Sequence, residues 1–219
     1  MRDTGHPAVN IAFLTGASCA GKTWTSERLA SEHALPILDV DAEVFAPIFT
    51  MYRRPELRNS INPTSSWAFL RRQTDFDRRF RLHHREWFTR TGVPAAFVAV
   101  GWIYCFREWR IPPLDCRFKL FVLQPSYDDF FVRFRAAVGE RFGGAASFFG
   151  ERPQEQRNEA DKHYRQFRDR DVELPAGDEM EYEVCVTAEE LIPRVARYCL
   201  GDGSRAVPER KPPTAGARP

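Results

Sequence analysis

The fold of this chain is decided by the stretch Gly16-Ala-Ser-Cys-Ala-Gly-Lys-Thr23, which reads G-x-x-x-x-G-K-T. The two glycines let the backbone curl so that consecutive N–H groups point at a bound phosphate. The lysine adds a positive charge for the β- and γ-phosphates of a nucleotide, and the threonine hydroxyl can hold Mg²⁺. We therefore expect a phosphate loop in which every residue lies around the nucleotide phosphates: Gly16, Ala17, Ser18, Cys19, Ala20, Gly21, Lys22 and Thr23.

The flanks of the phosphate loop have the context that this motif requires. Val9–Thr15 is a short apolar run bounded by polar residues, which predicts a buried strand. Trp24–His33 contains neither Gly nor Pro and predicts a helix. The positive end of that helix would face the phosphates, so a strand, the loop and a helix together predict a nucleotide site.

Four further apolar runs predict the rest of a sheet. Helical segments separate the runs, and this alternation predicts a parallel sheet covered on both faces. The expected fold is a three-layer α/β/α P-loop NTPase with a five-stranded parallel sheet. After the last strand, Thr187 and Glu190 form a capping box that opens a helix ending before Gly201. The four predicted strands are Pro36–Val40, Ala95–Gly101, Phe118–Gln124 and Glu181–Val186.

Chain length and composition favour one domain over residues 1–203. Residues 204–219 turn to Pro, Gly, Arg and Ala, which predicts a disordered tail. Residues 42–94 form a long insert between the second and third strands, in which Ser65–Thr91 predicts either one long helix or a bent pair. Residues 141–170 begin glycine-rich and continue as a polar helix, which is the pattern of an Arg-rich lid.

Net charge, cysteine spacing and the lengths of apolar runs limit the binding partners and the cellular location that the sequence predicts. The net charge of +2 gives no support to a general nucleic-acid-binding role. The five cysteines are scattered without metal-ligand spacing, which is typical of reduced thiols in a cytoplasmic protein. The sequence contains neither an apolar run of membrane-spanning length nor an N-terminal apolar signal region. We expect a cytoplasmic monomer or homodimer that uses no membrane.

Two carboxylates follow the second strand, at Asp39 and Asp41. Residues two apart on a strand share a face, so both would point together at the sheet edge near the phosphate loop. One can support Mg²⁺, for which we assign Asp39 with Thr23. The other, Asp41, can accept a proton from a substrate hydroxyl or align it for in-line attack. The alternative is that Asp41 only caps the following helix.

With this loop and acidic pair, the chain resembles the small P-loop kinases: the shikimate, gluconate, adenylylsulfate and adenylate kinases and the chloramphenicol phosphotransferase-like group. The resemblance covers residues 10–200 in layout, and 120–135 is similar to the family's fourth strand and its Arg-bearing helix. It implies ATP with Mg²⁺ as the nucleotide. It also implies that Arg133, or else Arg135, lies against the adenine. Lid arginines that would reach the phosphates are Arg141, Arg152 and Arg157.

The insert departs from the shortest relatives by its length, and the glycine run of shikimate kinase is reduced to Gly101-Trp102, which weighs against shikimate as the acceptor. In this layout the acceptor would lie between the second strand, the insert and the third strand. A charged helix face there suits an anionic or hydroxyl-rich acceptor, although such faces are often only solvated. Besides Asp41, the candidate acceptor residues are Arg71, Arg72, Asp75, Arg78, Arg79, His83, His84 and Trp102.

These features predict an ATP-dependent phosphotransferase that moves the γ-phosphate to a hydroxyl of a small molecule, with Lys22, Asp39 and Asp41 as catalytic residues. Two alternatives remain. A polynucleotide- or tRNA-directed kinase of the same fold would bind nucleic acid with a steep salt dependence. A non-catalytic nucleotide-dependent switch protein would bind nucleotide without transferring phosphate to any metabolite.

Overall fold

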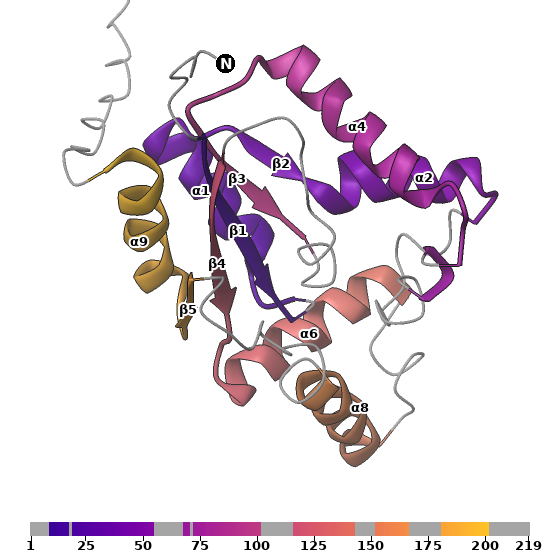
Figure 1. Ribbon diagram of the computed structural model, residues 1–219. Helices are drawn as coiled ribbons and strands as arrows, with labels where there is room; N and C mark the ends of the chain where they lie inside the picture. Colours follow the sequence, from indigo (N-terminus) through magenta and orange to yellow (C-terminus); the bar gives the residue numbers. More distant parts are fainter. Residues whose placement is uncertain are drawn as a thin grey trace, which may run out of the picture.

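A five-stranded parallel sheet forms the centre of the molecule, as predicted. The computed structural model describes residues 9–17, 19–54, 68–70, 72–101, 116–142, 152–166 and 181–201. The strand order is β2-β3-β1-β4-β5, so the strand that precedes the phosphate loop lies in the middle (Figure 1). The strands are β1 (Val9–Gly16), β2 (Ile37–Asp39), β3 (Ala96–Val100), β4 (Cys116–Leu123) and β5 (Glu181–Cys185).

Helices follow the strands in the described part of the chain. They are α1 (Lys22–His33), the short π-helix η1 (Asp41–Phe45), α2 (Ala46–Met51), α4 (Phe76–Thr91), α6 (Tyr127–Phe142), α8 (Pro153–Gln166) and α9 (Ala188–Leu200). Each predicted strand is found within two residues of its expected ends. None of these helices is both long enough and apolar enough to cross a membrane.

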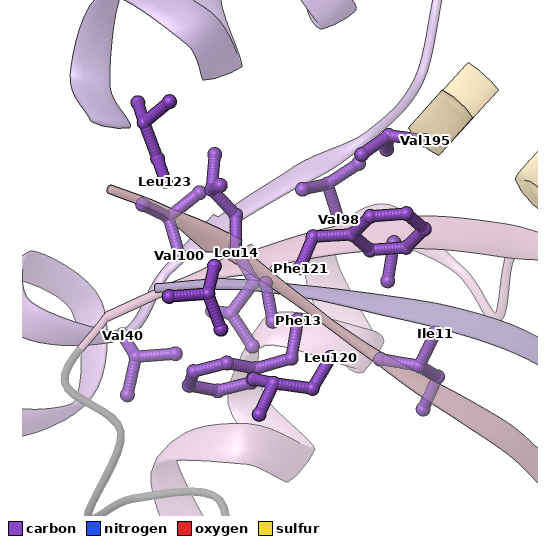
Figure 2. Close-up of a cluster of buried hydrophobic side chains, with 14 of the residues drawn as sticks. Ile11, Phe13, Leu14, Val40, Val98, Val100, Leu120, Phe121, Leu123 and Val195 are labelled. Atoms are coloured by element: carbon purple, nitrogen blue, oxygen red, sulfur yellow. The ribbon is translucent and has the colours of Figure 1, made fainter. Parts of the chain in front are cut away.

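Two aromatic contacts show that α9 and α4 cover opposite faces of the sheet. Tyr198 of α9 packs edge-on against Phe121, whereas Trp87 of α4 packs against Phe97. Phe121 lies beside Leu14 of β1, and Phe97 lies beside Ile11. Because Leu14 and Ile11 are three apart on one strand, they point to opposite faces. The two halves of the core meet at the fully buried β1 side chains (Figure 2).

The predicted cap of the last helix is confirmed. Thr187 accepts a hydrogen bond from the Glu190 N–H at 3.2 Å, and the Glu190 carboxylate accepts one from the Val186 N–H at 3.3 Å. The helix ends at Gly201, whose φ of +80° is one that glycine adopts more easily than any other residue. The sequence signals at this end of the chain therefore agree with the structure.

The insert contains a break that the sequence did not locate. Residues 68–70 are helical, but Arg72 and Gln73 donate to carbonyls three residues earlier, at 3.2 and 2.9 Å, and regular helix resumes only at Phe76. Of the two alternatives for Ser65–Thr91, the bent pair fits the described residues.

At the other end of the molecule, Tyr127 and Phe130 of α6 pack on Tyr164 of α8. Residues 143–151, 167–180 and 204–219, including much of the expected lid and the whole expected tail, lie outside the described residues.

Candidate active site

The phosphate loop joins the end of β1 to the start of α1. A Cβ added to Gly16 would lie 2.5 Å from the Leu123 carbonyl oxygen, so only glycine fits there. Gly21, immediately before α1, has a φ of +105°, and Cys19 has a φ of +68°. The Ala20 N–H donates to the Ala17 carbonyl at 3.1 Å, which closes the turn. The backbone thus adopts the curl that the two glycines predicted; Ser18 lies outside the described residues.

Lys22 is folded back into the loop. Its Nζ donates to the Gly16 carbonyl at 2.7 Å and to the Ala17 carbonyl at 2.9 Å. Burial lowers the pKa of Lys22 below its ordinary value, and electrostatic interactions with Asp41, Cys19 and Asp39, in that order, oppose the shift. The loop therefore holds a partly desolvated cation with both carboxylates of the acidic pair within its electrostatic reach.

Asp39 and Asp41 do not lie on one strand. The strand-alternation prediction for this pair is wrong, because β2 ends at Asp39 and Val40 already has helical angles of φ −63° and ψ −34°. Asp41 is therefore the first residue of η1. Asp39 Oδ1 accepts a hydrogen bond from the Ala42 N–H at 2.9 Å. The helix-capping role that was an alternative for Asp41 thus belongs to Asp39.

Asp41 lies against the end of β3. A Cβ added to Gly101 would lie 3.5 Å from Asp41 Oδ1 and 3.1 Å from the Val40 Cβ. Gly101 is itself tied to β1, because its N–H donates to the Leu14 carbonyl at 3.2 Å. Glycine after β3 thus lets η1 begin close to the sheet edge, with Asp41 beside the end of β3.

Arg133 of α6 reaches the outside of the phosphate loop. Its Nη1 donates to the Ala20 carbonyl at 2.8 Å, and a Cβ added to Gly21 would lie 2.9 Å from the same nitrogen. Arg135 is exposed on the same helix. Arg157 of α8 has its guanidinium 5.4 Å from the centre of the Phe131 ring. Arg152 is exposed, and the side chain of Arg141 lies outside the described residues. The roles of these arginines stay predictions.

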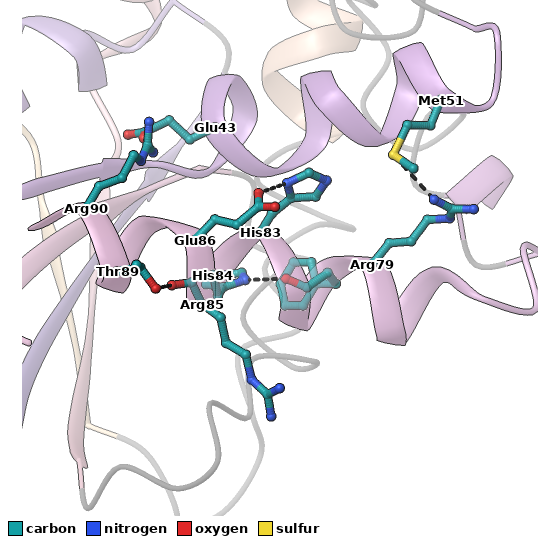
Figure 3. Close-up of polar contacts among 10 residues, drawn as sticks. Glu43, Met51, Arg79, His83, His84, Arg85, Glu86, Thr89 and Arg90 are labelled. Carbon is teal, nitrogen blue, oxygen red and sulfur yellow. Dashed lines mark hydrogen bonds and ion pairs between the residues drawn. The ribbon is translucent and has the colours of Figure 1, made fainter. Parts of the chain in front are cut away.

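The acceptor candidates of the insert are divided between internal contacts and solvent. Arg79 Nε donates to Asp75 at 2.5 Å, and the Tyr52 hydroxyl donates to the other oxygen of Asp75. Arg79 Nη1 also lies 3.4 Å from the Met51 sulfur (Figure 3). These contacts join the end of α2 to the start of α4. Arg72 and Arg78 are exposed, whereas Arg71 and Trp102 lie outside the described residues.

The two histidines of α4 have different surroundings. His83 Nδ1 lies 2.8 Å from Glu86, beside a groove between η1–α2 and α4 (Figure 3). His84 is buried, with Nδ1 2.7 Å from the Phe80 carbonyl, and burial lowers its pKa to about 4. Glu43 and Arg90, at 2.5 Å, form an ion pair between η1 and α4 that the sequence did not suggest. No local pattern could have found a pair so far apart in the chain.

The comparisons with known proteins give structural likeness only. No protein-family model and no curated protein matches the chain. Among solved structures, shikimate kinase from Acinetobacter baumannii in complex with shikimate is 15% identical over 91% of this chain and 97% of that one, with a TM-score of 0.45. A gluconokinase from Sinorhizobium meliloti 1021 is 14% identical over 88% and 91%, with a TM-score of 0.39. TT1252 from Thermus thermophilus is 13% identical over 90% and 100%, with a TM-score of 0.48.

The similar structures thus include a shikimate kinase and a gluconokinase, which are two of the kinds of kinase that the sequence resemblance named. Because each of these TM-scores lies below 0.5 and each identity at or below 15%, the likeness decides neither activity nor acceptor.

Proposed function

We propose that this protein is an ATP-dependent phosphotransferase that moves the γ-phosphate to a hydroxyl of a small molecule. The observation that supports the proposal is a phosphate loop whose lysine lies within the electrostatic reach of two carboxylates that follow β2. Lys22 lies in the phosphate loop, and Asp41 and Asp39 are both close enough to oppose the lowering of its pKa. A cation for the phosphates beside a carboxylate for the acceptor is the arrangement that phosphoryl transfer needs.

The loop residues fit a nucleotide triphosphate. The curl at Gly16 and Gly21 and the amino end of α1 favour phosphate oxygens. Lys22 would exchange its hydrogen bonds to the Gly16 and Ala17 carbonyls for phosphate oxygens, and so would carry its charge to the transferring group. The same exchange would raise the pKa of Lys22, because an anion replaces neutral carbonyls.

Thr23 and Asp39 would hold Mg²⁺, in part through water, and the ion when bound neutralises phosphate charge. Thr23 lies exposed in the first turn of α1, and Asp39 lies at the end of β2. Within the described ranges, no group of three or more His, Cys, Asp or Glu could hold a metal by itself. A nucleotide-bound Mg²⁺ needs no such group, since phosphates and waters supply most of its ligands.

Asp41 would take the proton of the acceptor hydroxyl or orient that hydroxyl for in-line attack. Its half-buried carboxylate beside Gly101 restricts the directions from which an acceptor can approach. Residues 141–170 would close over the site and exclude water, which limits hydrolysis of the nucleotide. The exposed Arg72 and Arg78 remain candidates for binding an anionic acceptor.

A screen of hydroxyl metabolites for acceptor-stimulated release of ADP tests the proposal. Asp41→Asn should abolish the stimulated release while MgADP still binds, because the loop itself is unchanged. Glu43→Gln is a matched control in the same helix, since Glu43 pairs with Arg90. Near-normal turnover by Asp41→Asn would show that the assigned role of Asp41 is wrong.

Two outcomes separate the alternatives. A wild-type protein that binds MgATP but transfers phosphate to no metabolite would point to a nucleotide switch. RNA or DNA oligonucleotides belong in the same screen at two salt concentrations. Phosphorylation of an oligonucleotide, with binding that falls steeply as salt rises, would replace the small-molecule acceptor by a nucleic acid.

A further inference from the structure

We infer that Arg133 is a positioning residue for the phosphate loop: from outside the loop it holds the Ala20 carbonyl so that the Gly21 N–H faces the phosphates. This rests on the proposed nucleotide site. The resemblance to small P-loop kinases instead implied a contact between Arg133 and the adenine. The two roles differ in whether the base of the nucleotide matters.

The contact is made with the loop backbone. Arg133 Nη1 donates to the Ala20 carbonyl at 2.8 Å, although the two residues are 113 positions apart in the chain. The same nitrogen would lie 2.9 Å from a Cβ on Gly21, which is closer than real Cβ contacts come. The end of the Arg133 side chain therefore lies close to the Ala20–Gly21 peptide, where a side chain at residue 21 would force it to shift.

The geometry of the peptide unit explains how the contact between Arg133 and the Ala20 carbonyl affects phosphate binding. In a trans peptide the carbonyl of one residue and the N–H of the next point in opposite directions. A carbonyl fixed toward Arg133 leaves the Gly21 N–H on the side away from α6. Phosphate binding requires loop N–H groups to point at the anion before it arrives, since reorienting a peptide group costs binding energy.

Lys22 fixes the same loop from the other end. Its Nζ bonds to the Gly16 and Ala17 carbonyls, while Arg133 bonds to that of Ala20. Lys22 must leave its carbonyls to reach a phosphate, whereas Arg133 can keep its hydrogen bond throughout. Arg133 would thus maintain the conformation of the loop when Lys22 moves to bind a phosphate. The same hydrogen bond connects α6 to the phosphate site.

Titration calorimetry with two magnesium-bound probes tests this role: ADP, and inorganic tripolyphosphate, which has no base. Arg133→Ala should weaken both by the same factor, on the order of tenfold or more, because a hydrogen bond from a charged donor is lost. Arg85→Ala is the matched control, since Arg85 is an exposed arginine of α4 that the proposed nucleotide site does not use, and it should leave both affinities unchanged. Arg133→Lys keeps a charged donor and should recover part of the loss for both probes.

Thermal unfolding without ligand completes the test. The proposal expects an unfolding temperature close to that of the wild type for Arg133→Ala and Arg133→Lys. A lowered unfolding temperature with unchanged affinities would show a merely structural role and overturn the inference. A loss for ADP alone would establish the adenine contact and overturn it too. Failure of the wild type to bind either probe would overturn both this inference and the proposed function, so the two failures are distinguishable.

Discussion

The phosphate loop and the insert are built in opposite ways. In the loop the ligand-facing groups belong to the backbone, and the requirements are local: glycines at Gly16 and Gly21 and a helix that begins at Lys22. In the insert the described polar side chains mostly bond to one another, as Asp75 does with Tyr52 and Arg79. A backbone site can be recognised from residue spacing, whereas a side-chain network depends on contacts that spacing does not encode.

This difference predicts different consequences of mutation. Changes in the loop should remove nucleotide binding, because each residue there shapes the phosphate cradle. Changes in the insert should lower stability and leave nucleotide affinity intact, because its contacts hold α2 and α4 together. The variants below are ordered by the size of the expected effect.

Gly16→Ala should have the largest effect. Its Cβ would meet the Leu123 carbonyl at 2.5 Å, and two paired strands cannot separate at one residue without loss of the ladder. We expect a loss of more than about 3 kcal/mol in the free energy of unfolding, with no detectable ADP binding. Urea unfolding and ADP titration measure the two effects.

Gly92→Ala is the control for backbone conformation. Gly92 has a φ of +73°, but a Cβ there would meet no atom within 4 Å. Because its ψ of 173° also lies in a region that only glycine adopts readily, the substitution should cost about 1 to 3 kcal/mol and leave ADP binding intact. Equal losses for the two variants would show that the close approach to β4 is not what requires Gly16.

His84 makes the stability of the insert depend on pH. Its folded-state pKa of about 4 lies below the ordinary value of 6.5, chiefly because of burial. As pH falls below 6.5 the unfolded chain takes up a proton first, so stability is lost between pH 6.5 and 4, by about 3 kcal/mol in total. Urea unfolding of wild type and His84→Leu at pH 7 and pH 4 measures it.

The difference between those two proteins isolates His84 from the other groups that titrate in acid. The wild type should lose about 3 kcal/mol more than His84→Leu between the two pH values. Parallel losses would mean that His84 is protonated without penalty in the folded state. ADP affinity at pH 7 should be the same for both proteins, because His84 packs within the insert against Phe80.

Sequence reasoning reached the sheet and the loop because their signals are local. Apolar runs gave the five strands, and the motif gave the phosphate loop and its helix. It also paired Asp39 and Asp41, but for the wrong reason: strand alternation fails once Val40 becomes helical. Residues two apart in the chain stay near one another in either conformation, so the paired role of the two carboxylates stays a prediction despite the error in backbone geometry.

The structure of the insert could not be predicted from local sequence patterns. The break before Phe76 contains neither Gly nor Pro, and its hydrogen bonds depend on Phe69 and Leu70 having already turned. Arg79 looked like an acceptor ligand from its helical face, yet Asp75 and Tyr52 already engage it. Arg133 was assigned to the adenine by resemblance, and its contact with Ala20 could not be seen from spacing. Long-range side-chain contacts are decided by packing, which one sequence leaves open.

Tyr52→Phe should have a moderate effect confined to the insert. It removes the hydroxyl that donates to Asp75, while Arg79 still bonds to that carboxylate. We expect a loss of about 1.5 kcal/mol in the free energy of unfolding, because Tyr52 is partly buried and its partner is charged. Tyr198→Phe removes an exposed bond to the Arg117 carbonyl and should cost about 0.5 kcal/mol. If Tyr52→Phe weakened ADP binding, the insert and the loop would not be independent.

Thr15→Val should have a smaller effect than Tyr52→Phe, and of the opposite sign. Thr15 is fully buried at the end of β1, and within the described part of the chain its hydroxyl has no hydrogen-bond partner. A buried hydroxyl that bonds to nothing costs about 1 kcal/mol or more, so the isosteric valine should raise the free energy of unfolding by about 1 kcal/mol.

Thr25→Val supplies the matched comparison across the phosphate loop. Thr25 is equally buried, but its hydroxyl donates to the Gly21 carbonyl at 3.0 Å. Its loss should lower the free energy of unfolding by about 1 kcal/mol, because a buried hydrogen bond is lost, although the Thr25 N–H still donates to the same carbonyl at 3.0 Å. Opposite signs for two buried threonines would show that hydrogen bonding, not side-chain shape, sets the energetics around the loop. A loss of ADP affinity in Thr15→Val would instead place the Thr15 hydroxyl among the groups that act on the nucleotide, and so extend the site beyond its backbone.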